Sequence, residues 1–247
     1  MKIIIAPART MAVDTDSFPY QDLPHFLPQA QEILTWMREL SYDQLHRLWW
    51  NCSQRLADKN YRWLQEMVLT QNLTPAIIAF TGLQYQHMAP DVFTDAGLAY
   101  IQNHLRILSG FYGLLRPFDG IVPYRLGMGD RATVAGTTSL YEFWGTRLAD
   151  ELYREDNLVL DLASVEYERA ILPYLSGERR LVKCVFGRVK DGKVKQQATQ
   201  AKMARGSMVR YLAENQIQDL AGVKRFTVGG YHFCPALSRA DCLTFTL

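Results

Sequence analysis

The sequence lacks most of the patterns that would assign a function at once. No Walker or GxGxxG pattern occurs, and the five histidines do not pair at a spacing that suits a metal ion. The four cysteines form no CxxC pair, so we expect reduced thiols rather than a disulfide framework or a zinc site. We therefore expect no cofactor and no metal.

Long hydrophobic runs are also missing. Lys2 is followed by a short apolar run that Pro7 and Arg9 close, which does not resemble a signal peptide, and no stretch approaches the roughly 20 apolar residues of a membrane span. We expect a cytoplasmic protein without a membrane partner. The formal net charge of +2 is too small to indicate a nucleic-acid partner, so any electrostatic argument depends on where the charges lie.

The apolar patterns predict an α/β protein. Short runs at residues 2–6, 76–80 and 158–162 are typical of buried strands, and Asp191-Gly192 predicts a hairpin between 181–189 and 193–198. Helical spacing predicts helices from Thr94 to about Leu108 and from about Ala201 to Asn215. No linker or repeat is visible, so residues 1–247 are predicted to form one domain, in an order of elements too irregular for a doubly wound sheet.

Basic residues gather between Glu178 and Arg210, on the predicted hairpin and the helix after it. This charge either neutralises phosphates or protects an exposed strand edge. On the helix, Lys202, Arg205 and Gly206 adjoin one another away from the apolar face. Because glycine costs roughly 1 kcal/mol in a helix interior, Gly206 indicates either close approach of a ligand or close packing of a neighbouring element.

A second candidate site lies between His104 and Gly129, where cations alternate with aromatic rings. Arginine forks suit phosphates, and flat rings suit stacking on bases. Its Leu108 to Gly113 segment is similar to a helix-hairpin-helix turn, although the second glycine comes one residue late; a purely structural turn is the alternative. The candidate residues here are Arg106, Ser109, Gly110, Tyr112, Gly113, Arg116, Tyr124 and Arg125.

A third cluster follows the predicted strand at 158–162. Asp161, Ser164, Glu166 and Glu168 lie where ligands bind in open α/β sheets, and two carboxylates there suit acid–base chemistry or a metal. The competing interpretation is helix capping, because Ser164 and Glu166 are typical of a helix N-terminus.

Several ordered motifs resemble those of the YaaA family, formerly a domain of unknown function. They are APART at residues 6–10, FTG at 80–82, HLRILSGFYGLLRP at 104–117, LYEFWG at 140–145, LASVEY at 162–167, AKMARG at 201–206 and GYHF at 230–233. Arg9 and Thr10 stand at the family's Lys-Thr pair. Two departures are visible: Leu83 and Gly127 stand where the family pattern has acidic residues.

The resemblance implies a single mixed α/β domain of unusual topology, the cantaloupe fold, with a positively charged cleft and a helix-hairpin-helix element. It also implies a role in the peroxide stress response, sequence-independent binding of double-stranded DNA, and limitation of iron-dependent oxidative damage. The alternative hypothesis is an enzyme that acts on a small phosphorylated or nucleotide-like substrate in the same cleft. The sequence contains no recognised catalytic motif and leaves the oligomeric state open.

Overall fold

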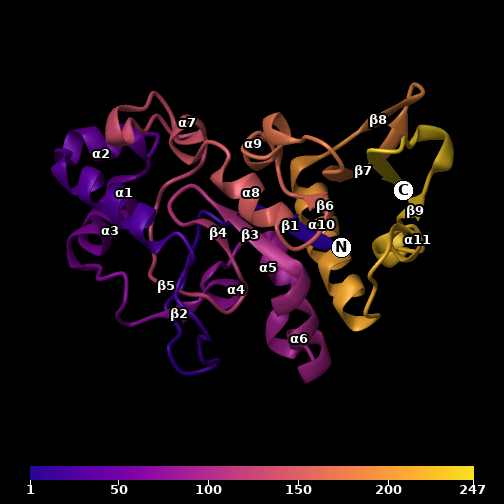
Figure 1. The fold of residues 1–247 in the computed structure, drawn as a ribbon, viewed down its shortest axis with the longest axis horizontal. Helices are drawn as coiled ribbons and strands as arrows, with labels where there is room; N and C mark the ends of the chain where they lie inside the picture. Colours follow the sequence, from indigo (N-terminus) through magenta and orange to yellow (C-terminus); the bar gives the residue numbers. More distant parts are fainter.

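A mostly parallel β-sheet runs through the molecule (Figure 1), and the computed structural model describes all residues 1–247. The strands lie in the spatial order β4 (Gly113–Leu115), β3 (Leu105–Ser109), β1 (Lys2–Ile5), β6 (Leu158–Leu162), β7 (Arg180–Lys190), β10 (Cys242–Thr246) and β9 (His232–Phe233), with β8 (Lys193–Lys195) paired to β7. The five strands from β3 to β10 are parallel, and β4, β8 and β9 pair antiparallel with their neighbours. A separate two-stranded ladder joins β2 (Thr74–Pro75) to β5 (Gly120–Ile121).

The order of the parallel strands differs from our expectation. Numbered along the chain, they lie in the order 2-1-3-4-5, which is a doubly wound arrangement. From β1 the chain continues to β3, its neighbour on one side in the sheet. From β6, the neighbour of β1 on the other side, it continues outward to β7. A crevice therefore opens at the carboxyl ends of β1 and β6, where α/β proteins bind their ligands.

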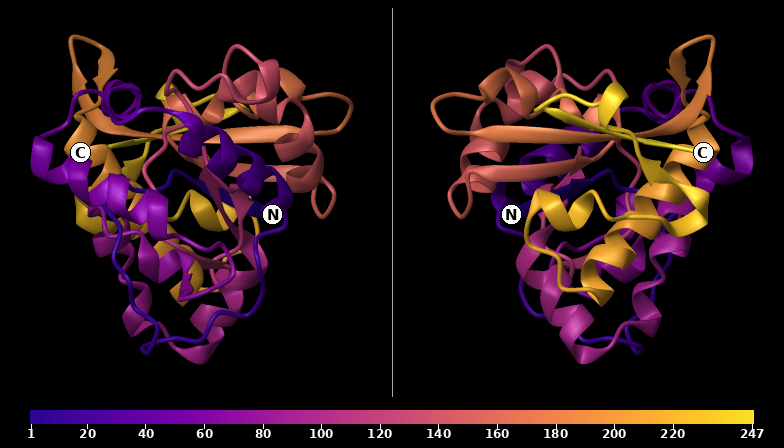
Figure 2. Two further views of the ribbon diagram at one scale, coloured as in Figure 1. Left: turned by 90° about the vertical axis from the view of Figure 1, so that its left-hand side faces the viewer. Right: turned by 90° about the vertical axis from the view of Figure 1, so that its right-hand side faces the viewer.

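Helices lie on both sides of the sheet (Figure 2). They are α1 (Leu27–Glu39), α2 (Tyr42–Leu48), α3 (Gln54–Glu66), α4 (Ala76–Ala79), α5 (Leu83–Met88), α6 (Asp95–His104), α7 (Leu140–Trp144), α8 (Arg147–Tyr153), α9 (Val165–Glu168), α10 (Ala198–Glu214) and α11 (Leu220–Val223). The long helix α10 packs on α5 and α6, and α1 to α3 form a lobe at one end of the molecule (Figure 1). None of these helices has the length and apolar character needed to cross a membrane.

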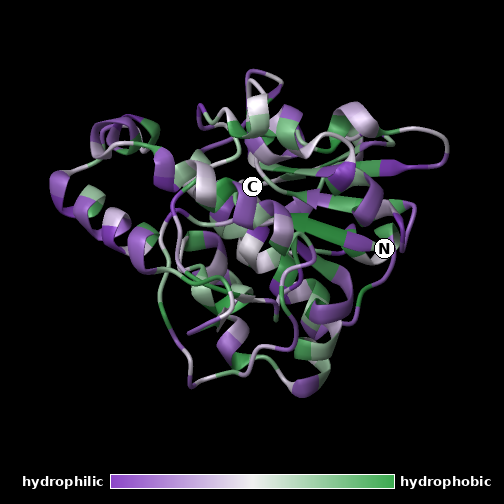
Figure 3. Ribbon diagram, turned by 60° about the vertical axis from the view of Figure 1, so that its left-hand side comes forward, coloured by the Kyte–Doolittle hydropathy of each residue, from purple (hydrophilic) through white to green (hydrophobic).

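Several local predictions are confirmed. β1 and β6 are strands, and Ile3, Ile4 and Ile5 are fully buried in a cluster that includes the green central strands of Figure 3. The β7–β8 hairpin turns at Asp191 and Gly192, with φ of 54° and 71°, the left-handed values that a two-residue turn requires. Helix α10 spans the predicted segment.

The helix predicted to reach Leu108 ends at His104, and Leu105–Ser109 is strand β3. Every residue of β3 is buried, with β1 on one side and β4 on the other. The apolar spacing of Leu105 and Leu108 suits one face of a helix, but pairing with two strands supplies backbone partners that a helix end would lack. The predicted helix-hairpin-helix turn at Leu108 to Gly113 is instead the β3–β4 hairpin.

The strand predicted at residues 76–80 is also wrong, because Ala76–Ala79 forms the single helical turn α4. The first two amides of this turn donate to carbonyls of another segment, Ala76 N–H to Asp119 and Ile77 N–H to Pro117. These contacts satisfy the amides that a helix start leaves free. An apolar run of this length does not distinguish a buried strand from a buried turn.

Candidate functional site

A cavity of about 300 Å³ lies at the carboxyl ends of β1 and β6, in the crevice that the strand order creates. We call it the switch-point cavity. Segments far apart in the chain line it: residues 6–10 after β1, 49–50 after α2, 82–85 at the start of α5, 124–130, 164–167 after β6, and two residues of α10. Its volume is at the lower end of the range for small-molecule sites and is far too small for a DNA duplex.

Six of the residues predicted to bind phosphate or nucleic acid meet in this cavity. They are Arg9, Thr10, Tyr124, Arg125, Lys202 and Arg205. None of its four cations forms an ion pair with a carboxylate of the chain. Unpaired cations along a concave wall favour an anionic ligand.

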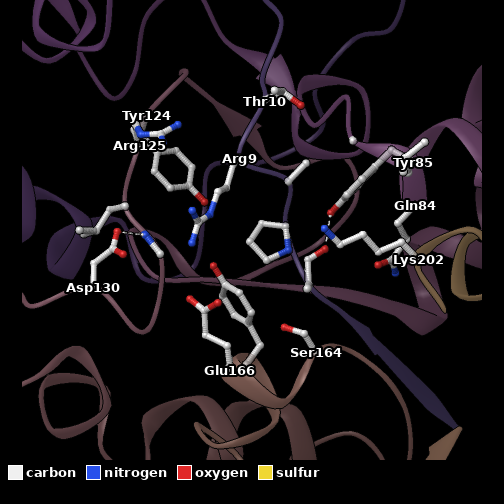
Figure 4. Close-up of a pocket in the computed structure, with 18 of the residues that line it drawn as sticks. Arg9, Thr10, Gln84, Tyr85, Tyr124, Arg125, Asp130, Ser164, Glu166 and Lys202 are labelled. Atoms are coloured by element: carbon white, nitrogen blue, oxygen red, sulfur yellow. Dashed lines mark hydrogen bonds between the residues drawn. The ribbon is translucent and has the colours of Figure 1, made fainter. Parts of the chain in front are cut away.

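The polar groups point inward from opposite walls (Figure 4). Arg9 projects between Tyr124 and Glu166, and Lys202 extends toward the cavity from the side of Tyr85. Arg9 and Lys202 are exposed, so a ligand that enters from solvent can reach both. Two accessible cations thus face a cavity whose tyrosines are buried.

The two carboxylates of the cavity are bound by backbone amides. Glu166 accepts the amide N–H of Gly129 at 3.0 Å, and Asp130 accepts that of Gly127 at 2.6 Å. Asp130 also accepts the indole N–H of Trp50 at 2.5 Å. These contacts anchor the acidic groups in the cavity wall and leave its cations free.

Ser164 stands at the N-cap of α9, yet its side chain makes no capping hydrogen bond. It lines the cavity together with Glu166. Ser164 therefore occupies the N-cap position that the capping interpretation predicts, but its hydroxyl group does not cap the helix.

Buried tyrosines form another part of the lining. Burial raises the pKa of Tyr85, Tyr124 and Tyr167 above the ordinary value, so their hydroxyl groups stay protonated. The Tyr85 hydroxyl donates to the carbonyl of Ala6 at 3.0 Å, and that of Tyr124 shares a hydrogen bond of 2.7 Å with Ser109. These contacts hold the 6–10 and 124–130 segments in place.

Asp161, on β6, is fully buried, and its Oδ1 accepts the amide N–H of Ala163 while Oδ2 has no partner. Burial raises the pKa of this carboxyl to about 7, and the nearby charges of Lys183 and Arg205 oppose the rise. Burial also lowers the pKa of Arg205, whose Nε has no hydrogen-bond partner. The Asp161 carboxyl thus lies behind the cavity wall, near the Arg205 guanidinium that lines it. In the whole structure, no group of three or more His, Cys, Asp or Glu side chains is arranged to hold a metal ion.

The remaining candidate residues lie outside this cavity. Ser109, Gly110, Tyr112 and Gly113 belong to the β3–β4 hairpin and are buried. A Cβ atom on Gly110 would lie 2.8 Å from the backbone of Gly127, and one on Gly113 would lie 2.8 Å from the ring of Trp144. These glycines permit close packing, and their backbone amides do not face solvent.

Arg106 and Arg116 are bound by Glu155. Arg106 lies 2.9 Å from this carboxylate and also donates to the carbonyls of Gln102 and Leu105, whereas Arg116 lies 3.4 Å from it. Lys2 completes the cluster around Glu155. These arginines neutralise Glu155, a carboxylate at the surface, rather than join the cations of the cavity.

Of the two interpretations of Gly206, close approach of a ligand and close packing of a neighbouring element, the structure supports close packing. A Cβ atom at this position would lie 2.1 Å from the carbonyl oxygen of Gln84 on α5. The glycine lets α10 approach α5, which brings Lys202 and Arg205 beside the cavity.

Some cavity residues were not recognised in the sequence, notably Trp49, Trp50 and Gln84. The adjacent tryptophans could have indicated the site, because two successive residues of a helix point in different directions and cannot both pack on its buried face. Leu83 and Gly127, the two departures from the family pattern, also line the cavity. A Cβ atom on Gly127 would lie 3.0 Å from Glu166 Oε1, so the glycine leaves room beside this carboxylate.

The fold and the cavity define an α/β protein with a small, cation-lined site at a topological switch point. Residues 1–237 match the family described as Peroxide stress protein YaaA, and the chain belongs to that family. It is 66% identical to a UPF0246 protein of Limosilactobacillus reuteri (strain DSM 20016), over 100% of this chain and 99% of that protein. UPF0246 proteins of Pediococcus pentosaceus and Lactiplantibacillus plantarum are 51% and 50% identical over 99% of this chain, and the matches cover 97% and 98% of those proteins.

Proposed function

We propose that this member of a peroxide-stress family binds a small phosphorylated or nucleotide-like molecule in the switch-point cavity. The observation that carries the proposal is the small cavity with four unpaired cations on its walls. Charged hydrogen bonds to phosphate contribute about 1.5–3 kcal/mol each. Two such contacts, from Arg9 and Lys202, therefore favour a phosphate ester over an uncharged ligand of the same size.

Calorimetric titration with ribose 5-phosphate and nucleoside monophosphates tests the proposal. The double variant Arg9→Ala/Lys202→Ala is expected to lose at least about tenfold in affinity. Arg188→Ala/Lys190→Ala, which removes the same charge from the exposed β7–β8 hairpin, is the matched control and is expected to bind like the wild type. Equal loss in both variants would assign the effect to net charge, and no binding by the wild type would reject the proposal.

We assign proton transfer in this cavity to Glu166, because its carboxylate faces Arg9 and Tyr124 (Figure 4). If the bound molecule is also converted, Glu166→Gln retains binding and loses turnover, because the amide keeps the hydrogen bond from Gly129 but not the basicity. Mass spectrometry of nucleotide and sugar-phosphate mixtures incubated with either protein detects the difference. Conversion that persists in Glu166→Gln would exclude this residue as the base.

Nucleic-acid binding is a second candidate function, favoured by a basic stripe on the terminal lobe. Arg55, Lys59 and Arg62 follow one another at helical spacing on α3, all exposed and none ion-paired with a carboxylate. Such a stripe neutralises phosphates of a duplex that is too wide for the cavity. In this second proposal the duplex lies on the outer surface, and binding there limits oxidative, iron-dependent damage to the DNA.

Fluorescence anisotropy of a labelled duplex at several salt concentrations tests this candidate. Replacement of the three α3 cations by alanine is expected to weaken binding and to lower the log–log salt slope by up to about one unit per lost phosphate contact. Replacement of Arg188, Lys190 and Lys193 on the hairpin is the control. Binding that is weak, or equally affected by both sets, would count against a duplex partner.

A further inference from the structure

Trp50 is unusual among the hydrophobic side chains because it is large, exposed and fixed. It is 64% exposed, the highest value among the large hydrophobic residues on the surface. Its indole N–H is held by Asp130 at 2.5 Å, so the ring has a defined orientation. An exposed ring that is held in place is the arrangement expected of a stacking surface.

The backbone beneath this ring is strained. Trp50 and the following Asn51 both have left-handed φ values, 59° and 47°. Non-glycine residues in this region cost of order 1 kcal/mol each and gather at ligand sites. These values belong to the turn that ends α2, where the amides of Trp50 and Asn51 donate to the carbonyls of Arg47 and His46 at 3.0 Å, so this turn fixes the backbone from which the indole projects.

Trp50 also separates two cavities. It lines the switch-point cavity on one side, and on the other it lines a second cavity of about 530 Å³ between α1, α2 and residues 131–133. Arg47 and Arg131 line this second cavity, both exposed, and no carboxylate lines it. Neither arginine forms an ion pair with a carboxylate of the chain.

We propose that the two cavities form one binding site for a nucleotide ligand whose base stacks on Trp50. This inference rests on the proposed function, because one phosphate of the ligand lies with Arg9 and Lys202 in the switch-point cavity. A second phosphate lies with Arg47 and Arg131. The ligand is thus a nucleotide unit with two phosphates, either within a single strand or in a free dinucleotide.

Three probes separate base from phosphate recognition in calorimetric titrations: deoxyribose 5-phosphate, thymidine 5′-phosphate and a short single-stranded oligothymidylate. Wild type is expected to bind the nucleotide at least about fivefold more tightly than the sugar phosphate. Trp50→Ala is expected to weaken nucleotide binding more than sugar-phosphate binding and so to remove this advantage. Trp50→Phe, which keeps a ring but loses the hydrogen bond to Asp130, is expected to retain most of it.

The Phe variant distinguishes a platform from a structural tether. If Trp50 serves only to hold residue 130 in place, Phe and Ala impair binding equally, and the inference is overturned. Trp63→Ala, which removes a half-buried indole of α3 outside both cavities, controls for general effects of tryptophan loss. Equal binding of nucleotide and sugar phosphate by wild type also overturns the inference but leaves the proposed function intact, whereas absence of binding by every probe overturns both.

The second cavity is tested with Arg47→Ala/Arg131→Ala. This variant is expected to weaken oligothymidylate binding at least about tenfold and to leave thymidine 5′-phosphate unaffected. A dinucleoside pyrophosphate identifies the source of the ligand: tighter binding of the oligonucleotide indicates a strand, and tighter binding of the pyrophosphate indicates a free dinucleotide. Unchanged binding of both two-phosphate probes would exclude the second cavity from the site.

Discussion

Gly206 on α10 lies against the carbonyl oxygen of Gln84 on α5, so closely that a Cβ atom would approach this oxygen to 2.1 Å. The contact determines how near the two helices come to each other. Because α10 carries Lys202 and α5 begins beside the 6–10 segment, the same contact determines the width of the switch-point cavity.

Gly206→Ala is expected to destabilise the protein by about 1–2 kcal/mol, since an overpacking cost of up to about 3 kcal/mol exceeds the helix-propensity gain of about 1 kcal/mol. Denaturant unfolding measures the change. Gly97→Ala is the matched control in α6, where the nearest atom to an added Cβ is a side-chain carbon at 3.3 Å. Equal stability of the two variants would show that α5 moves away at little cost.

Asp161→Asn is expected to become more stable relative to wild type as the pH rises from about 4 to 7. The pKa of Asp161 is about 7 in the fold, whereas the ordinary value for an aspartate side chain is 3.8, so the folded state binds the extra proton between these values. Its contribution is therefore fully present below about pH 4 and is lost as the pH approaches 7. The difference in unfolding free energy should grow by up to about 1.4 kcal/mol per pH unit in this window.

Denaturant unfolding of both proteins between pH 4 and 8 measures this difference. Burial also raises the pKa of Asp119 to about 7, but that carboxyl is common to both proteins and cancels. A difference independent of pH would mean that Asp161 is ionised in the fold and paired with Lys183 or Arg205.

Arg106→Ala and Arg9→Ala are expected to have opposite effects. Arg106 is 6% exposed and is bound to Glu155, so its loss should cost about 2 kcal/mol of stability with ligand affinity unchanged. Arg9 is exposed without an ionic partner, so its loss should weaken phosphate binding with little change in stability. Unfolding and calorimetric titration of both variants check the pair, and reduced affinity in Arg106→Ala at unchanged stability would contradict the assignment.

Cys184 is expected to stay unmodified in the folded protein, although the family is named for peroxide stress. The thiol is buried, and burial raises its pKa well above the ordinary value, whereas peroxide and alkylating reagents attack the thiolate. Mass spectrometry after iodoacetamide treatment should detect label on Cys184 only after unfolding. Cys52, Cys234 and Cys242 are partly exposed and serve as internal controls. Native labelling of Cys184 would reveal an opening of the sheet near β7.

Local features of the chain could be predicted where one residue pair decides the conformation. Asp191-Gly192 determines the β7–β8 turn through its left-handed φ values. The apolar runs of β1 and β6 also predicted buried strands, because apolar side chains on both faces are typical of a strand that is covered on both sides.

The tertiary structure alone decided three other features. Leu105–Ser109 fits a helical and an extended pattern equally well, and its pairing with β1 selects the strand. Arg106 resembled a ligand residue until Glu155, distant in the chain, proved to be its partner. The neighbours of Trp50 across the two cavities come from separate segments of the chain. Hydrophobic periodicity indicates which face of an element is buried, but it does not indicate which distant charge or ring lies opposite that element. The site consists of such contacts between distant segments, so only the tertiary structure defines it.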